Sequence, residues 1–370
     1  MHRSSLAIPV AILLMILAQS PRALLCQKDQ SENASPPTVS PAADGIFAAF
    51  QRRPIVALGD DHGMSQEEDF YASLVRDKRF PDAVGNVVVK FGDAAQQATL
   101  DRYLAGDVIP YEDLRRVWSD TVGWIPTVEA LGYVNFFAQV RAVNLGLPAD
   151  KHIRVWLGDP PIDWSKIKTN EDFLPELEQR NQYPADIIKT EILAKGRKAL
   201  VIYGEFHFYG EKSLRGLVEH DYPGTFFIVT VYRGFTDSGC SKAFEEAIQS
   251  WPIPALAEPI RGTKLEGLLR PQNCHFIASD SIHFGPDTSQ AEAAKQMATS
   301  EAYTSGIDGD ALLFLGPASS LTYSPQLGDI YFDSAFRKEI ERRSLIEVGQ
   351  PLYPFIPPAS PQFLHRTASE

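Results

Sequence analysis

The stretches IVALGDDHG at residues 55–63 and ALVIYGEFH at residues 199–207 decide the fold. Each is an apolar run followed by a glycine, an acidic residue and a histidine three positions after the glycine. Continuous apolar runs of this length are typical of strands buried on both faces of a parallel sheet. Because ligands bind at the carboxyl ends of such strands, we predict that the two histidines and their acidic neighbours lie at one edge of the sheet.

Further apolar runs alternate with helical patterns along the chain. This alternation predicts a single α/β domain at 45–350, with an open, mainly parallel sheet flanked by helices. The further strands are expected at Val87–Phe91, Ile153–Leu157, Phe226–Val231 and Ala311–Leu315. The helices are expected at Gln66–Arg76, Ala94–Ala105, Tyr111–Ser119, Thr127–Asn144, Pro184–Lys195 and Ser213–His220, with a charged terminal helix at Phe332–Ser344.

The N-terminus has the pattern of an export signal. An apolar run from Leu6 to Leu17 follows a basic residue and precedes the small-x-small sequence that ends at Ser20. It is shorter than the about 20 residues of a membrane span. We therefore expect a signal peptide at 1–20 and a secreted or periplasmic protein; an uncleaved anchor and a lipoprotein at Cys26 are the less favoured alternatives.

Composition places two segments outside the folded domain and leaves the cysteines open. Residues 21–44 are rich in Ser, Pro and Ala and predict a disordered linker, and residues 351–370 predict a Pro-rich tail. In an oxidising compartment Cys240 and Cys274 could form a disulfide, and two separate thiols are the alternative.

Charge and missing motifs exclude several classes of function. The chain of 370 residues carries 35 Lys and Arg against 47 Asp and Glu, a formal charge of −12, which disfavours a nucleic-acid partner. Hydrophobic residues make up 44%, enough for a large core. No GxSxG elbow, Walker A loop, GxGxxG or HExxH motif occurs, so serine hydrolases, NTPases, dinucleotide enzymes and zincins lack sequence support.

Other polar residues near predicted strand ends are candidate ligand-binding groups. Asp159 and Asp163 follow one strand in a loop made rigid by two prolines, although either aspartate could instead cap a turn. Arg116 could bind an anionic group, although an exposed helix surface is the more ordinary explanation. Lys90 ends another strand, and Glu68 lies on the acidic helix after the first histidine.

The chain resembles the superfamily of erythromycin esterase-like, ChaN-type haem-uptake, TraB and Tiki proteins. The stretches that carry the resemblance are, in sequence order, GDDHG with its acidic helix, VVVKFGD, RVWLGDPPIDW, ALVIYGEFH and ALLFLGPASSLT. The resemblance implies a sheet with paired GxxH histidines, here His62 and His207, with Glu205 and Glu68 as acidic neighbours. It implies metal-dependent proteolysis, ester hydrolysis or haem binding. Lys90 stands where a glutamate is common in the family and reverses the local charge.

Two functions therefore compete. The first is an exported metal-dependent hydrolase in which His62, His207 and Glu205 hold Mn²⁺, Co²⁺ or Zn²⁺, and Glu205 or Asp60 activates water. The second is a non-catalytic binder of haem or another small ligand, with a histidine, Tyr203 or Tyr209 as axial ligand. Either would take a small-molecule or peptide ligand and meet a membrane only through the signal or a lipid anchor.

Overall fold

The computed structural model of the protein describes residues 34–271, 274, 276, 309–349 and 351. They form an eight-stranded sheet of order β1-β7-β8-β6-β2-β5-β3-β4. The strands from β8 to β4 are parallel, and β7 and β1 pair antiparallel at the other edge. The strands are β1 (Thr38–Pro41), β2 (Ile55–Asp60), β3 (Asn86–Asp93), β4 (Arg154–Asp159), β5 (Ala199–Gly204), β6 (Phe226–Val231), β7 (Ala255–Glu258) and β8 (Ala311–Phe314).

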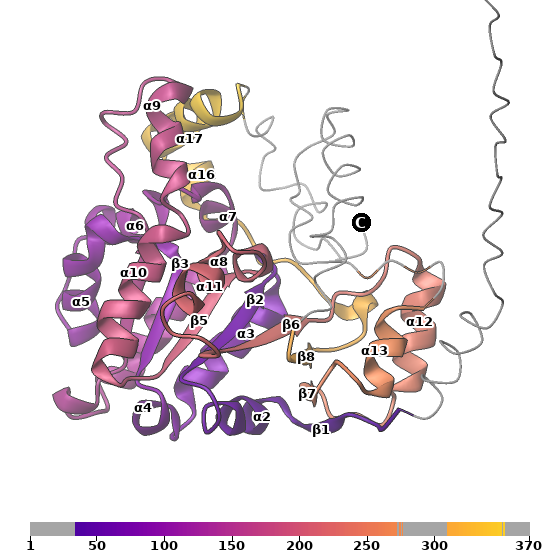
Figure 1. Ribbon diagram of the computed structural model, residues 1–370. Coiled ribbons are helices and arrows are strands. Elements are labelled where there is room, and N and C mark those ends of the chain that lie inside the picture. The colour runs from indigo at the N-terminus through magenta and orange to yellow at the C-terminus, as the bar shows by residue number, and fades with distance from the viewer. Residues whose placement is uncertain (1–33, 272–273, 275, 277–308, 350, 352–370) are drawn as a thin grey trace, which may run out of the picture.

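Helices cover the sheet, which confirms the predicted open, mainly parallel α/β architecture (Figure 1). They are α2 (Ala42–Ala49), α3 (Ser65–Arg76), α4 (Phe80–Ala83), α5 (Gln97–Ala105), α6 (Tyr111–Ser119), α7 (Trp124–Glu129), α8 (Leu131–Asn144), α9 (Asn170–Glu178), α10 (Gln182–Ile187), α11 (Leu214–Glu219), α12 (Ser238–Ala247), α13 (Lys264–Leu269), α16 (Asp329–Phe332) and α17 (Ser334–Val348).

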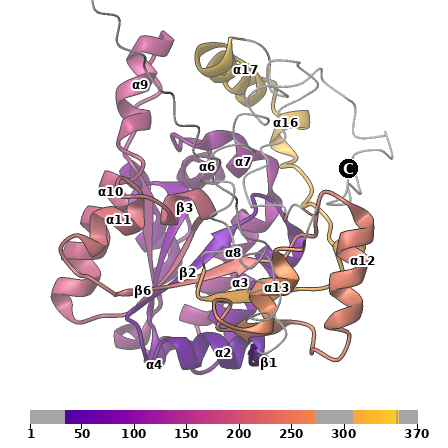
Figure 2. The same ribbon diagram turned by 45° about the vertical axis from the view of Figure 1, so that its right-hand side comes forward.

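The two faces of the central strands enter different cores. In β2, Val56 and Leu58 pack with α3 and α8, whereas Ile55 and Ala57 pack with α10 and α11. This alternation follows from the two-residue period of a strand and explains why the run is apolar throughout. Figure 2 places α9, α16 and α17 together at one end of the molecule, opposite α2 and α4.

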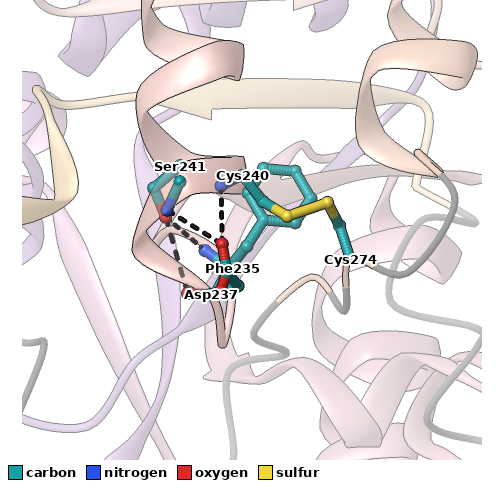
Figure 3. The surroundings of a disulfide bond; sticks show 6 residues. Phe235, Asp237, Cys240, Ser241 and Cys274 are labelled. Carbon is teal, nitrogen blue, oxygen red and sulfur yellow. Dashed lines mark hydrogen bonds between the residues drawn. A yellow bond between two sulfur atoms is a disulfide. The ribbon is translucent and has the colours of Figure 1, made fainter.

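A third core lies under α12 and α13, beside β7 and β8 (Figure 1). Here Cys240 and Cys274 form a disulfide with their Cα atoms 6.0 Å apart, which settles the alternative left open by the sequence (Figure 3). Asp237 caps α12, because its Oδ1 accepts hydrogen bonds from the backbone N–H groups of Gly239 and Cys240.

Two local predictions differ from the structure. The end of the expected linker is ordered: β1 pairs with β7, and α2 begins at Ala42. The pairing of β1 with β7 orders this segment, because Thr38–Pro41 has little apolar pattern that would have predicted a strand. The helix expected over Thr127–Asn144 is divided between α7 and α8, because Ala130 takes an extended conformation.

Several predictions fall where the structure gives no description. The signal peptide at 1–20, Cys26, and all of the Pro-rich tail except Pro351 lie outside the described residues. Within the residues that are described, no helix has both the length and the apolar character needed to cross a membrane.

Candidate functional site

The two Gly-x-x-His loops are neighbours at the carboxyl edge of the sheet. β2 and β5 pair in register, so Asp60 at the end of β2 lies beside Gly204 at the end of β5. A Cβ at Gly59 would come within 3.1 Å of the Glu205 Cβ, so the glycine permits this close approach. The loops therefore project from adjacent strand ends, where ligands bind in open α/β sheets.

Three side chains form a hydrogen-bonded chain from β2 to β3. The Nδ1 atom of His62 lies 2.6 Å from Asp60 Oδ2, and its Nε2 atom lies 2.7 Å from Lys90 Nζ. Because a lysine ammonium only donates, the neutral imidazole accepts from Lys90 at Nε2 and donates its Nδ1–H to Asp60. The side chain of His62 is 19% exposed, whereas Asp60 is 2% exposed and Lys90 9% exposed.

Asp60 is held as a carboxylate inside the protein. Burial alone would raise its pKa, but hydrogen bonds from His62, Tyr133 and Tyr71 outweigh burial and keep the pKa below its usual value. The Tyr71 hydroxyl donates to Oδ1 at 2.9 Å and the Tyr133 hydroxyl to Oδ2 at 2.7 Å. An ionised, fully bonded Asp60 fixes the tautomer and orientation of His62.

Contacts around Asp61 fix the backbone of the first loop. The N–H of Asp61 donates to Glu67 Oε2 at 2.8 Å, and the Tyr71 hydroxyl oxygen lies 2.9 Å from Glu67 Oε1. The carboxylate of Asp61 accepts from Arg233 Nη2 at 2.5 Å in a buried ion pair. These contacts hold the residues on either side of His62 in place.

Glu67 and Glu68 are buried acids whose pKa values are raised. Burial, with the charges of Asp60 and Asp61, raises the pKa of Glu67 well above its usual value. Burial raises the pKa of Glu68 to about 8. Glu68 packs against Gly132, where a Cβ would lie 1.9 Å from its Oε2. Glu68 was expected to bind ligand, but it packs under α8.

His207 faces the same region from β5. Its Nδ1 atom lies 2.5 Å from Asn181 Oδ1. Burial lowers the pKa of His207 well below its usual value, and the neighbouring side chains of Lys90, Arg180 and His62 lower it further. His207 is therefore neutral at pH 7, and the structure brings both histidines into the same electrostatic neighbourhood.

Arg180 and Asp159 border the site on the β4 side. A Cβ at Gly123 would lie 2.8 Å from Arg180 Nη2 and 3.5 Å from Lys90 Cε, so both cationic side chains reach this glycine. The N–H of Gly123 donates to Asp159 Oδ2 at 3.0 Å, and Arg180 Nε lies 3.8 Å from Asp159 Oδ1. Asp159 thus supports the site rather than capping a turn.

The residues expected to bind a metal do not fit one. One oxygen of Glu205, Oε1, accepts hydrogen bonds from Thr230 at 2.6 Å and Tyr209 at 2.7 Å. Lys90 Nζ stands where a metal bound to His62 Nε2 would lie. Across the part of the chain that the structure describes, no group of three or more His, Cys, Asp or Glu side chains could hold a metal ion. Among these described residues, His62, His207 and Glu205 are therefore not brought together as a metal-ligand set.

Of the side chains expected as axial haem ligands, Tyr209 and His62 are engaged in other hydrogen bonds, and Tyr203 is buried. Tyr203 is 1% exposed, and its hydroxyl packs against Gly158. The Tyr209 hydroxyl donates to Glu205, and both ring nitrogens of His62 have partners. Among the named ligands, the Tyr203 hydroxyl is buried without a hydrogen-bond partner in the described residues, and the Nε2 atom of His207 has no partner described above.

Two predicted ligand-binding residues lie outside the site. Asp163 is exposed, and its Oδ1 accepts from the backbone N–H and hydroxyl of Ser165 in a local turn. Arg116, exposed on α6, pairs with Asp120, the residue that follows the helix. Both expectations are corrected: the alternatives of a turn cap and a helix surface hold here.

The partners that hold the site together escaped prediction from the sequence. Tyr71 lies one helical turn after Glu67, a spacing that could have suggested a shared contact. No recognisable motif contains Tyr133, Arg180 or Asn181. The packing of α8 brings Tyr133 to Asp60, and the start of α10 brings Asn181 to His207.

No protein-family model matches the chain, and no curated protein sequence matches it. Two solved structures are similar to it at low identity. The type III effector HopBA1 is 16% identical, with 55% of this chain and 88% of that chain covered at a TM-score of 0.35. ChaN of Campylobacter jejuni, solved with cofacially bound haem, is 13% identical, with 52% and 86% covered at a TM-score of 0.29.

Proposed function

We propose that this protein is a hydrolase of small-molecule esters or amides that uses Asp60 and His62 as its acid–base pair and needs no metal ion. The observation that carries the proposal is the chain Asp60–His62–Lys90, with His62 Nδ1 2.6 Å from the carboxylate and Nε2 2.7 Å from the amine. A base oriented by a buried carboxylate is the arrangement that general-base catalysis requires.

His62 is the residue that moves the proton. Its side chain is the most exposed of the three, so substrate and water reach it first. When the flexible stem of Lys90 turns its ammonium onto the substrate carbonyl, Nε2 is released to take a proton from water. Asp60 stabilises the imidazolium that forms, and His62 then returns the proton to the leaving group.

Lys90 supplies the charge that the family resemblance assigns to a metal. In the tetrahedral intermediate the carbonyl oxygen becomes an oxyanion, and an ammonium at that position stabilises it in a site with little water. Lys90 enters from β3, opposite the acid–base pair on the β2 loop. The two functions therefore come from different strands and can act on one carbonyl group.

The experiment is a panel of chromogenic substrates: 4-nitrophenyl butyrate, a 4-nitroanilide and dihydrocoumarin. We expect hydrolysis of at least one of them, reduced about 10²–10⁴-fold in His62→Asn, since this is the contribution of a general base. His220→Asn is the matched control, because that side chain is 85% exposed and pairs with Asp221. We expect hydrolysis to survive 1,10-phenanthroline.

Three results would each overturn the proposal. They are no hydrolysis of any substrate, hydrolysis by His62→Asn at the wild-type rate, and loss of activity to the chelator with recovery on adding Zn²⁺, Mn²⁺ or Co²⁺.

We also propose that the protein is exported. The support is the N-terminal sequence pattern together with the Cys240–Cys274 disulfide, a bond that persists in oxidising compartments. Fractionation of cells expressing the full chain tests this. We expect a mature protein outside the cytoplasm with an N-terminus at residue 21, and a chain kept intact in the cytoplasm would contradict it.

A further inference from the structure

We infer that Lys90 is a nucleophile that forms a Schiff base with a small 2-oxo acid. The inference rests on the acid–base role of His62 in the proposed function, but it goes beyond hydrolysis to a covalent bond between protein and ligand. It follows from three features: the base beside the amine, the surroundings of the amine, and the guanidinium nearby.

The first feature is that the amine has a base within reach, and the base has an orienting group. Lys90 Nζ lies 2.7 Å from His62 Nε2, and Asp60 fixes His62 from the other side at 2.6 Å. A nucleophile, a base and an orienting acid in hydrogen-bond contact form the usual signature of covalent catalysis. Lysine here occupies the position that serine has in the hydrolase triads.

The second feature is the surroundings of Lys90, a buried side chain that lies beside a second cation. Lys90 is 9% exposed, and Arg180 is a second cation that reaches the same glycine, Gly123. Desolvation and a neighbouring cation are the two devices by which proteins make lysine nucleophilic. Asp159 is a nearby opposing charge; one of its oxygens accepts from the N–H of Gly123 and the other faces Arg180.

The third feature selects the ligand. The side chain of Arg180 is 23% exposed and so accessible to a small molecule. A guanidinium binds a carboxylate through two parallel hydrogen bonds. A 2-oxo acid carries its carboxylate on the carbon next to the carbonyl, and it can therefore meet Arg180 while its carbonyl carbon meets Lys90 Nζ.

The reaction balances with the groups present. His62 takes one proton from the Lys90 ammonium, and the amine lone pair then forms a bond to the carbonyl carbon while the carbonyl electron pair moves to oxygen. That oxygen receives the proton back from His62. A second N–H proton leaves with the hydroxyl group as water, and the product is a protonated imine. Ammonium and ketone thus give iminium and water, with charge and atoms conserved.

The test is reductive trapping on the full chain with pyruvate and sodium cyanoborohydride, followed by peptide mass spectrometry. We expect one reduced pyruvate adduct on the peptide that contains Lys90. Lys151 is the internal reference, because its side chain is 50% exposed and pairs with Asp82 on the surface. The adduct at Lys90 should exceed that at Lys151 at least about tenfold, as for an activated lysine.

Variants assign the roles. Lys90→Arg should give no adduct at position 90, His62→Asn should slow trapping about 10²-fold or more, and Arg180→Met should remove the preference for pyruvate over acetaldehyde. Circular dichroism checks that each variant folds. Because the lysine comparison is made within the wild-type chain, it decides the matter even where a variant fails to fold.

The outcomes separate this inference from the hydrolase. A wild-type protein that hydrolyses esters but traps pyruvate no faster at Lys90 than at Lys151 overturns the Schiff base and leaves the hydrolase standing. Trapping at Lys90 without hydrolysis supports the Schiff base and overturns the hydrolase. Equal trapping of acetaldehyde and pyruvate overturns the 2-oxo acid as the ligand.

Discussion

Replacing Asp60 with asparagine changes one atom at the centre of the site. Asp60 accepts three hydrogen bonds, from His62 at 2.6 Å, Tyr133 at 2.7 Å and Tyr71 at 2.9 Å. An asparagine amide keeps one acceptor oxygen and presents an N–H₂ group at the other position. When that group donates to His62 Nδ1, the imidazole proton moves to Nε2 and confronts Lys90.

The cost to the rate should exceed the cost to stability. A wrong tautomer in such a pair lowers kcat by about 10²–10⁴-fold, which corresponds to about 2.7–5.4 kcal/mol of transition-state stabilisation. The folded protein loses hydrogen bonds to a charged group worth about 1.5–3 kcal/mol each. The substitution also removes a buried negative charge, which favours the folded state. The lost hydrogen bonds and the removed charge therefore change the free energy of unfolding in opposite directions.

The assay measures kcat and KM with the best substrate of the chromogenic panel, and Tm by circular dichroism. Asp163→Asn is the matched control, because it makes the same chemical change at an exposed aspartate in a local turn. We expect a large loss of kcat in Asp60→Asn and none in Asp163→Asn. An Asp60→Asn protein within about twofold of the wild-type kcat, well below the expected loss, would refute the role of Asp60.

Three further predictions concern pH, the disulfide and haem. Burial raises the pKa of Glu68 to about 8. The folded chain therefore keeps a proton that the unfolded chain releases near the ordinary pKa of 4.5. The stability that this group contributes is present at low pH and is lost as the pH rises toward 8. Glu68→Gln should therefore shrink the fall in Tm between about pH 5.5 and about pH 8.5, and an unchanged fall would contradict the burial argument. The Cys240–Cys274 bond joins residues 34 apart in the sequence and should stabilise the protein by about 3–4 kcal/mol, which denaturant unfolding of the double serine variant measures; an unchanged midpoint would contradict it. The haem alternative predicts a Soret shift on titration with haemin that His207→Ala removes and His62→Ala keeps, and no such shift in the wild-type protein would eliminate it.

The sheet could be predicted because its strands are marked by local composition. β2, β5 and β6 are buried on both faces, so each is apolar throughout, and the six predicted strands all occur. β1 and β7 escaped prediction because they are strands of only four residues, whose pairing depends on each other and on β8. The division between α7 and α8 depends likewise on a tertiary contact, the bond from the Leu131 N–H to the Pro325 carbonyl.

The sequence by itself determined which strands end in histidine and acid, and therefore at which edge of the sheet His62 and His207 lie. It could not determine what those side chains bind, because a hydrogen bond depends on distances of tenths of an ångström between segments far apart in the chain. Only the tertiary structure placed Lys90 against His62, turned Glu205 toward Thr230 and Tyr209, and buried two tyrosines against Asp60. In the sequence, two histidines and several acids suggest a metal site. In the tertiary structure the Lys90 ammonium lies beside His62, and Asp60, His62 and Lys90 form an acid–base chain.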